Sequence, residues 1–383
     1  METVDVGVPI ERHVGEARVA LTPEVVRRLT ERGITVRVAS QAGSKANFPD
    51  DDYIKAGASI VTQQEALGCN IVLTVRTPID EDIRNLKHGT LLIGMLNPFD
   101  KDNAVKLASA GLTAFALEAA PRTTRAQALD VLSSQANIAG YKATLIAAHH
   151  YPRFMPMLMT AAGTVKAARV LVLGAGVAGL QAIATAKRLG AIVEASDVRP
   201  AAKEQIESLG AKFLDVPFET DEEREAGLGS AGYARAMPQS WLARQAALVH
   251  ERAKQADIVI TTALIPGRPA PTLIPVDTVA KMKGGSVIVD LAAGRGAEYQ
   301  SHVGGNCPLT ETDKVVVRYG VTIVGISNLA AMMPTDASAL YARNLLEFLK
   351  LIVTKEGTVN IDLDDDIVAA TLLTRAGQVL RKF

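Results

Sequence analysis

Short apolar segments alternate with amphipathic segments along most of the chain. Runs such as VDVGV at 4–8 and TLLIGM at 90–95 have the length and composition of buried strands. Segments such as PEVVRRLTERG at 23–33 and KDNAVKLASAG at 101–111 carry apolar residues at helical spacing and end at a glycine. This alternation predicts an α/β fold, in which doubly wound parallel sheets are covered by helices on both faces.

The pattern divides the chain into two such units. The first covers residues 1–135, and a helix at about 134–151 leads into the second. Strand, helix, strand repeats in the second unit predict a doubly wound nucleotide-binding sheet. Its six expected strands lie at 170–173, 192–196, 212–216, 257–261, 286–290 and 322–326.

The C-terminal segment begins with a long amphipathic stretch, PTDASALYARNLLEFLKLIV at 334–353. It predicts a helix capped by Thr335 or Asp336, with an apolar face that includes Leu340, Leu345, Leu349 and Ile352. We expect this helix to return the chain to the first unit, where TVNIDL and IVAATLLT form strands. The predicted domains are therefore 1–135 plus 335–383, and 136–334.

A glycine-rich turn follows the first strand of the second unit. Gly174, Gly176 and Gly179 form G-x-G-x-x-G, and Val177 begins the next helix. In such loops the first glycine permits a tight turn, the second lets the backbone approach a pyrophosphate, and the third lets the helix pack closely. The phosphates then lie at the helix N-terminus, where free N–H groups favour an anion.

An acidic residue, Asp197, ends the second strand of this unit, 23 residues after Gly174. A carboxylate at that place accepts hydrogen bonds from the two ribose hydroxyls of the adenosine half of a dinucleotide. It also repels a 2′-phosphate, so NAD is favoured over NADP, although Arg199 two residues later can soften this preference. Loop and acid together predict a Rossmann domain that binds NAD(H).

Composition excludes several other classes of protein. The 383 residues include 41 Lys and Arg and 41 Asp and Glu, so no basic excess indicates nucleic acid or anionic lipid as a partner. Two separated cysteines, Cys69 and Cys307, predict neither a disulfide framework nor a zinc site, and no metal site is expected. The uncharged run at 170–186 is short for a membrane span, so no membrane insertion is expected.

Several long motifs resemble one known family. They are GAGVAGLQAIATAKRLGAIVEASDVRP at 174–200, TTALIPGRPAPTLI at 261–274 and RTTRAQALDVLSSQANIAGY at 122–141. These segments are similar to the NAD(H)-binding component of proton-translocating nicotinamide nucleotide transhydrogenase. The N-terminal segment VPIERHVGEARVALTPEVVRRL fits both that family and its relative, alanine dehydrogenase.

The resemblance implies an enzyme built from three components. One binds NAD(H), one spans the membrane and couples the reaction to proton movement, and one binds NADP(H). Hydride would pass directly between the two nicotinamide rings. This chain would be the first component, a homodimer that lies on the cytoplasmic face of the bacterial inner membrane through its partners.

The resemblance also implies roles for individual residues. In the loop at 121–135, the family's spacing selects Arg122, Gln127 and Asp130 as the catalytic group, with Ser133 nearby. Gln127 would contact the nicotinamide, Arg122 would hold the pyrophosphate or orient the ring, and Asp130 would fix both. The other implied contacts to the nucleotide are a lid residue, Tyr233, and the residues Thr262, Ala263, Leu264 and Asn306.

One segment departs from the family pattern. The residues AGRGAEYQSHV at 293–303 separate DLA from GGNC and form an apparent insertion.

Two other functions compete with this interpretation. An amino-acid dehydrogenase of the alanine dehydrogenase type needs a lysine and a histidine at its substrate. The matching positions here hold Arg76, and Leu96 and Asn97, although Arg18, the expected carboxylate binder, remains. A module that only binds NAD would keep the glycine loop but would not need the loop of Arg122, Gln127 and Asp130.

Overall fold

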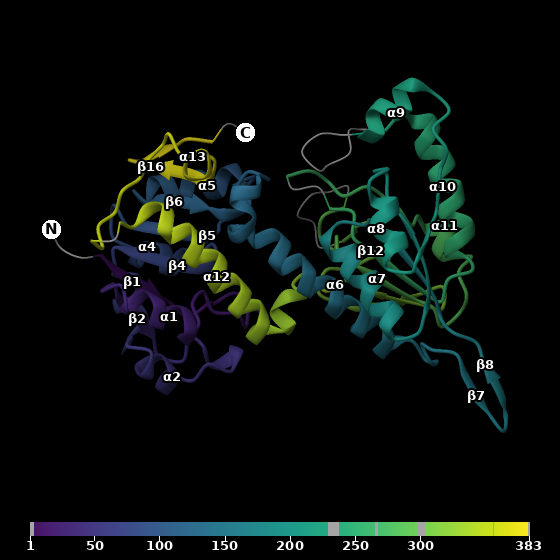
Figure 1. Cartoon of the computed structure of the whole chain (residues 1–383), viewed down its shortest axis with the longest axis horizontal. Helices are drawn as coiled ribbons and strands as arrows, with labels where there is room; N and C mark the ends of the chain where they lie inside the picture. Colours follow the sequence, from purple (N-terminus) through teal and green to yellow (C-terminus); the bar gives the residue numbers. More distant parts are fainter. Residues whose placement is uncertain (1–3, 229–236, 265–266, 297–302, 355, 382–383) are drawn as a thin grey trace. The chain divides into compact units, whose positions relative to one another are not determined.

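The computed structural model describes residues 4–228, 237–264, 267–296, 303–354 and 356–381. The chain divides into two compact units (Figure 1): unit 1 is Met1–Gln135 with Ala330–Phe383, and unit 2 is Ala136–Leu329. The second boundary lies five residues before the one that we placed at 334 from the sequence. Each unit is built on a sheet of mostly parallel strands, which confirms the predicted α/β class.

Unit 1 contains an eight-stranded sheet in the order β17-β16-β6-β5-β4-β1-β2-β3. β1 to β6 are parallel neighbours, whereas β16 pairs antiparallel with both β6 and β17. The strands are β1 (Asp5–Val8), β2 (Thr35–Ala39), β3 (Ser59–Val61), β4 (Ile71–Arg76), β5 (Leu91–Met95), β6 (Thr113–Ala116), β16 (Leu372–Arg375) and β17 (Gln378–Val379).

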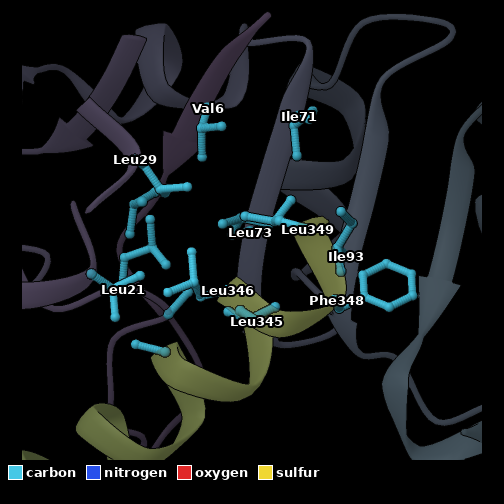
Figure 2. Close-up of a cluster of buried hydrophobic side chains, with 14 of the residues drawn as sticks. Val6, Leu21, Leu29, Ile71, Leu73, Ile93, Leu345, Leu346, Phe348 and Leu349 are labelled. Carbon is cyan, nitrogen blue, oxygen red and sulfur yellow. The ribbon is translucent and has the colours of Figure 1, made fainter. Parts of the chain in front are cut away.

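The core of unit 1 joins this sheet to the C-terminal helix α12 (Pro334–Ile352). In Figure 2, Leu345, Leu346 and Leu349 of α12 lie beside Leu73 of β4 within one buried cluster. Leu340, which we expected on this face, is 37% exposed. The other helices of unit 1 are α1 (Pro23–Thr30), α2 (Asp50–Lys55), α3 (Gln63–Leu67), α4 (Asp80–Asn85), α5 (Lys101–Ser109) and α13 (Asp366–Thr371).

The start of α12 differs from the prediction. The N-cap residue is Met333, and it makes no side-chain cap bond. The Thr335 hydroxyl instead donates to the Ala46 carbonyl at 3.0 Å and accepts from the Asn47 amide at 3.0 Å. A tertiary contact thus uses the hydroxyl that the sequence indicated as a cap.

Two predicted C-terminal strands are also partly wrong. The residues 358–363 form no strand beyond a single bridge between Val353 and Val359. The first half of IVAATLLT is the helix α13, because the Asp365 carboxylate accepts the N–H groups of Ile367 and Val368 and so caps a first turn. The strand β16 begins only at Leu372.

Unit 2 contains a seven-stranded sheet in the order β11-β10-β9-β12-β13-β15-β14. Its first six strands follow the 3-2-1-4-5-6 order of a doubly wound dinucleotide-binding sheet, and all of them pair in parallel. The strands are β9 (Arg169–Leu173), β10 (Ile192–Ser196), β11 (Lys212–Phe213), β12 (Ile258–Thr261), β13 (Val287–Asp290), β14 (Val315–Arg318) and β15 (Val321–Val324).

The seventh strand, β14, was not predicted. It pairs antiparallel with β15 through a tight turn at Tyr319 and Gly320, both of which have positive φ. Such a turn matches the twist of a hairpin. A second hairpin, β7 (Leu158–Thr160) with β8 (Gly163–Val165), extends from the rest of unit 2 (Figure 1).

The helices of unit 2 pack on its sheet, and α6 connects the two units along the chain. α6 runs from Val131 to His150, three residues earlier at its start than predicted. The other helices are α7 (Val177–Arg188), α8 (Ala202–Ser208), α9 (Asp221–Leu228), α10 (Gln239–Ala253) and α11 (Val276–Val279). Within the described ranges, no helix has both the length and the apolar character that crossing a bilayer requires.

Candidate functional site

The glycine loop joins β9 to α7, and its three glycines meet different constraints. Gly174 has φ +95°, and a Cβ there would lie 2.6 Å from the Thr262 hydroxyl. At Gly179 a Cβ would lie 1.9 Å from the Gly174 carbonyl oxygen. At Gly176 a Cβ would meet no described atom within 4 Å. The first and third glycines therefore serve the fold, and the second leaves open space beside the backbone.

The first turn of α7 offers this open space to an anion. Gly176 is the N-cap residue and brings no side-chain cap, and Val177, the first helical residue, is 39% exposed. The first N–H groups of a helix have no partner within the helix, and its dipole favours negative charge there. The geometry suits a phosphate group at this turn.

Helix α6 supports α7 from behind. A Cβ at Gly140 would lie 2.0 Å from the Ala178 carbonyl oxygen, so only glycine allows this close approach. Our sequence reasoning did not select Gly140. The available signal was a glycine inside an otherwise helical pattern, which often marks a packing requirement.

Asp197 lies directly after β10, with its side chain 7% exposed. Its Oδ2 accepts the N–H of Ala175 in the glycine loop at 2.7 Å. Its Oδ1 accepts the N–H of Arg199 at 2.8 Å. The Arg199 guanidinium completes the set, with Nε 2.9 Å from Oδ1 and Nη2 3.0 Å from Oδ2. Asp197 therefore holds the glycine loop as well as standing where a ribose ligand is expected.

Thr262, Ala263 and Leu264 follow β12 at the same edge of the sheet as the glycine loop. The Thr262 hydroxyl donates to the Gly174 carbonyl at 2.9 Å, so this segment and the loop are tied together. Leu264 is 43% exposed. The backbone of Ala263 is held at both its N–H and its carbonyl by the Asn306 side chain, at 3.1 and 2.9 Å.

Asn306 is fully buried, and its amide is used within the protein. Besides the two bonds to Ala263, its Nδ2 donates to the Pro271 carbonyl at 2.8 Å. We expected this residue to approach the nicotinamide. In this structure it positions the segment that follows β12, and a direct contact with nucleotide stays a prediction.

Asp290, at the end of β13, was missed as a positioning residue. It is fully buried, and its two carboxylate oxygens accept bonds from the hydroxyls of Thr261 and Thr310 and from the N–H groups of Ala292, Asn306 and Cys307. A Cβ at Gly305 would lie 2.3 Å from Asp290 Oδ2. The GGNC motif thus wraps around a buried carboxylate. The signal was an acid ending a buried strand.

Two expectations fall wholly or partly outside the described residues. Tyr233, the expected lid residue, lies in 229–236. The middle of the insertion, 297–302, also lies outside. On either side of it, the Gly294 N–H donates to the Gly304 carbonyl at 2.9 Å, and Val303 bridges to Glu311.

The loop that carries Arg122, Gln127 and Asp130 belongs to unit 1. It contains a 3-10 segment, Thr124–Leu129, anchored by the buried side chains of Ala126 and Leu129. Arg122 and Gln127 are exposed, and the Gln127 side chain forms no hydrogen bond within the described part of the chain. Its carboxamide is thus available to a ligand.

Asp130 ends this loop and begins α6. Its Oδ1 accepts the Ser133 N–H at 2.9 Å, and its Oδ2 accepts the Ser133 hydroxyl at 2.6 Å. The pair forms an N-terminal helix cap. We expected Asp130 to hold Arg122 and Gln127 directly. In the structure its carboxylate fixes the start of α6, beside the loop.

Arg125 has a separate role, as its spacing suggested. Its guanidinium bonds both oxygens of Asp365 at 2.6 and 2.9 Å, and also contacts Asp366. Arg125 lowers the pKa of Asp365 to about 2. This exposed ion pair ties the loop to the cap of α13.

Helix α12 supplies positioning residues that the sequence did not reveal. Asn344 donates to the Ala128 carbonyl at 2.8 Å, and its Oδ1 accepts the Ser134 hydroxyl at 2.8 Å. A second contact runs from the Gln135 amide to the Ala337 carbonyl at 3.0 Å. α12 therefore holds both the Gln127 loop and the first turns of α6.

Arg18, the candidate carboxylate binder, is occupied within unit 1. It is 5% exposed, forms a two-pronged ion pair with the buried Glu16 at 2.7 Å, and donates to Gln135 at 2.8 Å. The same region holds two further acids. Burial raises the pKa of Glu11 to about 8 and that of Glu118 to about 7.

Comparison with known proteins identifies the family. Residues 7–139 match the N-terminal domain and residues 143–382 the C-terminal domain of the family described as alanine dehydrogenase/PNT. The chain is 46% identical to the first of the separate chains that make up NAD(P) transhydrogenase subunit alpha in Rhodospirillum rubrum, over 98% of this chain and 97% of that protein. It is 43% identical to the NAD(P) transhydrogenase subunit alpha of Haemophilus influenzae, over 97% of this chain and 71% of that protein.

Solved structures give the same result. A crystal structure of transhydrogenase from Sinorhizobium meliloti matches with a TM-score of 0.87 and 45% identity, and covers 98% of this chain and 100% of that one. A structure of L-alanine dehydrogenase matches with a TM-score of 0.80 and 27% identity, over 98% of this chain and 97% of that one. The chain therefore belongs to the alanine dehydrogenase/PNT family, and within it to the transhydrogenase alpha subunits that bind NAD(H), as the sequence motifs indicated.

Proposed function

We propose that this chain is the NAD(H)-binding component of a proton-translocating transhydrogenase. It binds NAD(H) at the glycine loop of unit 2 and exchanges hydride with NADP(H) held by a partner component. A separate membrane component couples the exchange to proton movement. The relatives named NAD(P) transhydrogenase subunit alpha support this proposal, because they match nearly the whole chain.

The geometry of unit 2 fits a dinucleotide. The open space at Gly176 and the uncapped start of α7 suit the pyrophosphate. Asp197 stands at the end of the second strand, where the adenosine ribose is expected. Thr262, Ala263 and Leu264 lie at the same edge, with one exposed apolar side chain, Leu264. The nicotinamide of the bound cofactor supplies the hydride chemistry.

The single observation that carries the proposal is the exposed Gln127 carboxamide on a firmly held loop. Hydride transfer between two nicotinamides needs alignment and exclusion of water, and needs no general acid or base. A neutral amide on an anchored loop suits that task. We propose that Gln127 and Arg122 contact nucleotide, and that Asp130 with Ser133 sets the position of the loop relative to α6.

The alanine dehydrogenase alternative finds no support at the matching positions. Leu96 is a buried apolar residue, and the backbone N–H groups of Leu96 and Asn97 are bound by Glu118 at 3.0 and 2.7 Å. Arg18 is paired with Glu16. A substrate carboxylate would have to displace a buried acid.

We further propose that the chain is a homodimer, located at the cytoplasmic face of the inner membrane through its partners. The β7–β8 hairpin supports an interface in unit 2, since Met157 and Met159 at its first strand are 61% and 77% exposed. Exposed large apolar side chains on one hairpin are typical of surfaces that become covered. We also expect Tyr233 to act as a lid on bound nucleotide.

A mixing experiment tests the central proposal. The purified chain with NADH is combined with a transhydrogenase NADP-binding component loaded with NADP⁺, and fast formation of NADPH is followed. Transfer without any added amino acid or keto acid is the expected result. Failure of transfer, with NADH bound and the partner shown to work with another donor component, would contradict it.

A further inference from the structure

Arg199 is a side chain that competes for the acceptor positions of Asp197. A carboxylate offers about four lone-pair positions. In Asp197 all are used: two by the backbone N–H groups of Ala175 and Arg199, and two by the Arg199 guanidinium. The carboxylate is therefore already saturated in the protein without nucleotide.

The two kinds of bond differ in what can replace them. The Ala175 N–H belongs to the glycine loop, and the Arg199 N–H belongs to the turn before α8, where the Arg199 carbonyl accepts the Ala202 N–H at 3.1 Å. Both are held by the fold. The guanidinium is 29% exposed and can leave without moving the backbone.

The guanidinium and a ribose diol present matching donors. Nε and Nη2 of Arg199 give one bond to each oxygen of Asp197. The 2′- and 3′-hydroxyls of an adenosine ribose also supply two donors, one for each oxygen. Because no lone pair remains, the diol can bind only where the guanidinium now lies.

We propose that Arg199 is an internal competitor for the ribose site, which the adenosine half of NAD(H) must displace from Asp197. Arg199 thereby lowers the affinity for nucleotide and sets how much of it depends on the ribose hydroxyls. This inference rests on the proposed binding of NAD(H) to unit 2. It concerns a residue outside the glycine loop and outside the Gln127 loop.

The test compares Arg199→Ala with the wild-type chain in titrations of NADH, followed by the fluorescence of the reduced nicotinamide. We expect the dissociation constant to fall about three- to tenfold, because a partly exposed ion pair no longer opposes binding. Arg199→Lys, whose single ammonium cannot bridge both oxygens, should give an intermediate value.

Two controls separate competition from a change in overall charge or folding. Arg188→Ala removes an exposed arginine of α7 that forms no ion pair among the described residues, and should leave the dissociation constant unchanged. The second control is 2′,3′-dideoxyadenosine monophosphate, measured by displacement of NADH. It has no hydroxyls to exchange, so its affinity should be the same for Arg199→Ala and the wild type.

The outcomes are distinct. NADH binding that is unchanged or weaker in Arg199→Ala, with the variant folded by circular dichroism, overturns the competitor role and leaves the proposed function standing. An equal gain for the dideoxy nucleotide also overturns it, since the gain would then be electrostatic. Absence of NADH binding in wild type and variants alike removes the proposed function, and the competitor role with it.

Discussion

The ends of the parallel strands have opposite characters in the two units. In unit 2, β9 and β12 end in a glycine loop and a short segment with little side-chain cover, and the N-terminus of α7 carries no side-chain cap. In unit 1, the backbone N–H groups at the ends of β4 and β5 are bound by the carboxylates of Glu11 and Glu118. One edge presents backbone donors to a ligand, and the other satisfies them with its own side chains.

The difference teaches that a doubly wound sheet does not by itself create a ligand site. Ligands bind at the carboxyl ends of such strands when donors there are left unpaired. Unit 1 pairs its donors internally and buries Arg18 against Glu16, so this edge contributes stability. The ligand-facing group of unit 1 lies elsewhere, on the loop with Gln127.

The largest expected effect tests whether the edge of unit 1 is structural. Arg18→Met should destabilise unit 1 by about 3–5 kcal/mol, because it leaves the buried Glu16 charge without its paired cation. The only tryptophan, Trp241, lies in unit 2 and is 2% exposed, so its fluorescence reports that unit. In urea, the circular dichroism transition should move and the Trp241 transition should stay.

The double variant Glu16→Gln with Arg18→Met is the matched control. It should recover much of the loss, since the buried charge is gone. If Arg18→Met alone left both transitions in place, the edge of unit 1 would not depend on this ion pair.

The next effect concerns the loop of unit 1 that we propose to face nucleotide. Gln127→Asn should slow hydride transfer about 100-fold, because a shorter side chain misplaces a contact that aligns the rings. NADH affinity should change only a few-fold. Thr124→Ala, an exposed change on the same 3-10 segment, should leave transfer intact. A normal transfer rate in Gln127→Asn would remove this role.

The glycines of unit 2 provide a matched pair. Gly179→Ala places a Cβ against the Gly174 carbonyl and should destabilise unit 2 by about 1–3 kcal/mol, followed by Trp241 fluorescence. Gly176→Ala places its Cβ in open space, so it should leave stability unchanged and weaken NADH binding about tenfold. Equal effects of the two changes on both measurements would show that Gly176 has no separate ligand role.

The smallest effect is a pH dependence of unit 1. Burial raises the pKa of Glu11 from 4.5 to about 8, so the folded protein keeps a proton that the unfolded chain has lost. Between these two values stability falls as pH rises. From about pH 6 to pH 7.5 the loss should be on the order of 1 kcal/mol larger in the wild type than in Glu11→Gln. Parallel curves for the two proteins would contradict the shifted pKa.

The features that were predictable from the sequence are those encoded over short distances. The strands of unit 2, the spacing of Gly174, Gly176 and Gly179, and the acid at Asp197 follow from local pattern. A glycine requirement and a strand period are local, so they are visible without partners. The Arg122, Gln127 and Asp130 group came from family resemblance, and its physical meaning depends on the neighbours that anchor it.

The features that were missed depend on partners far away in the chain. Asn344 holds the Ala128 carbonyl across 216 residues, and Arg18 reaches Gln135 across 117. No pattern near Asn344 distinguishes it from any other polar residue of an amphipathic helix. The same holds for Thr335, whose expected capping hydroxyl is used by Ala46 and Asn47 instead.

The sequence by itself determined the α/β class, the glycine loop, the acid after its second strand and the family. Local backbone preference and hydrophobic periodicity are enough for the first three, and the long motifs for the last. Only the tertiary structure decided which polar groups are left for a ligand: Asn306 and Arg18 are consumed by internal contacts, Gln127 is exposed, and Asp197 is shared with Arg199. Availability depends on which donors and acceptors have already been satisfied, and folding brings those partners together from distant segments.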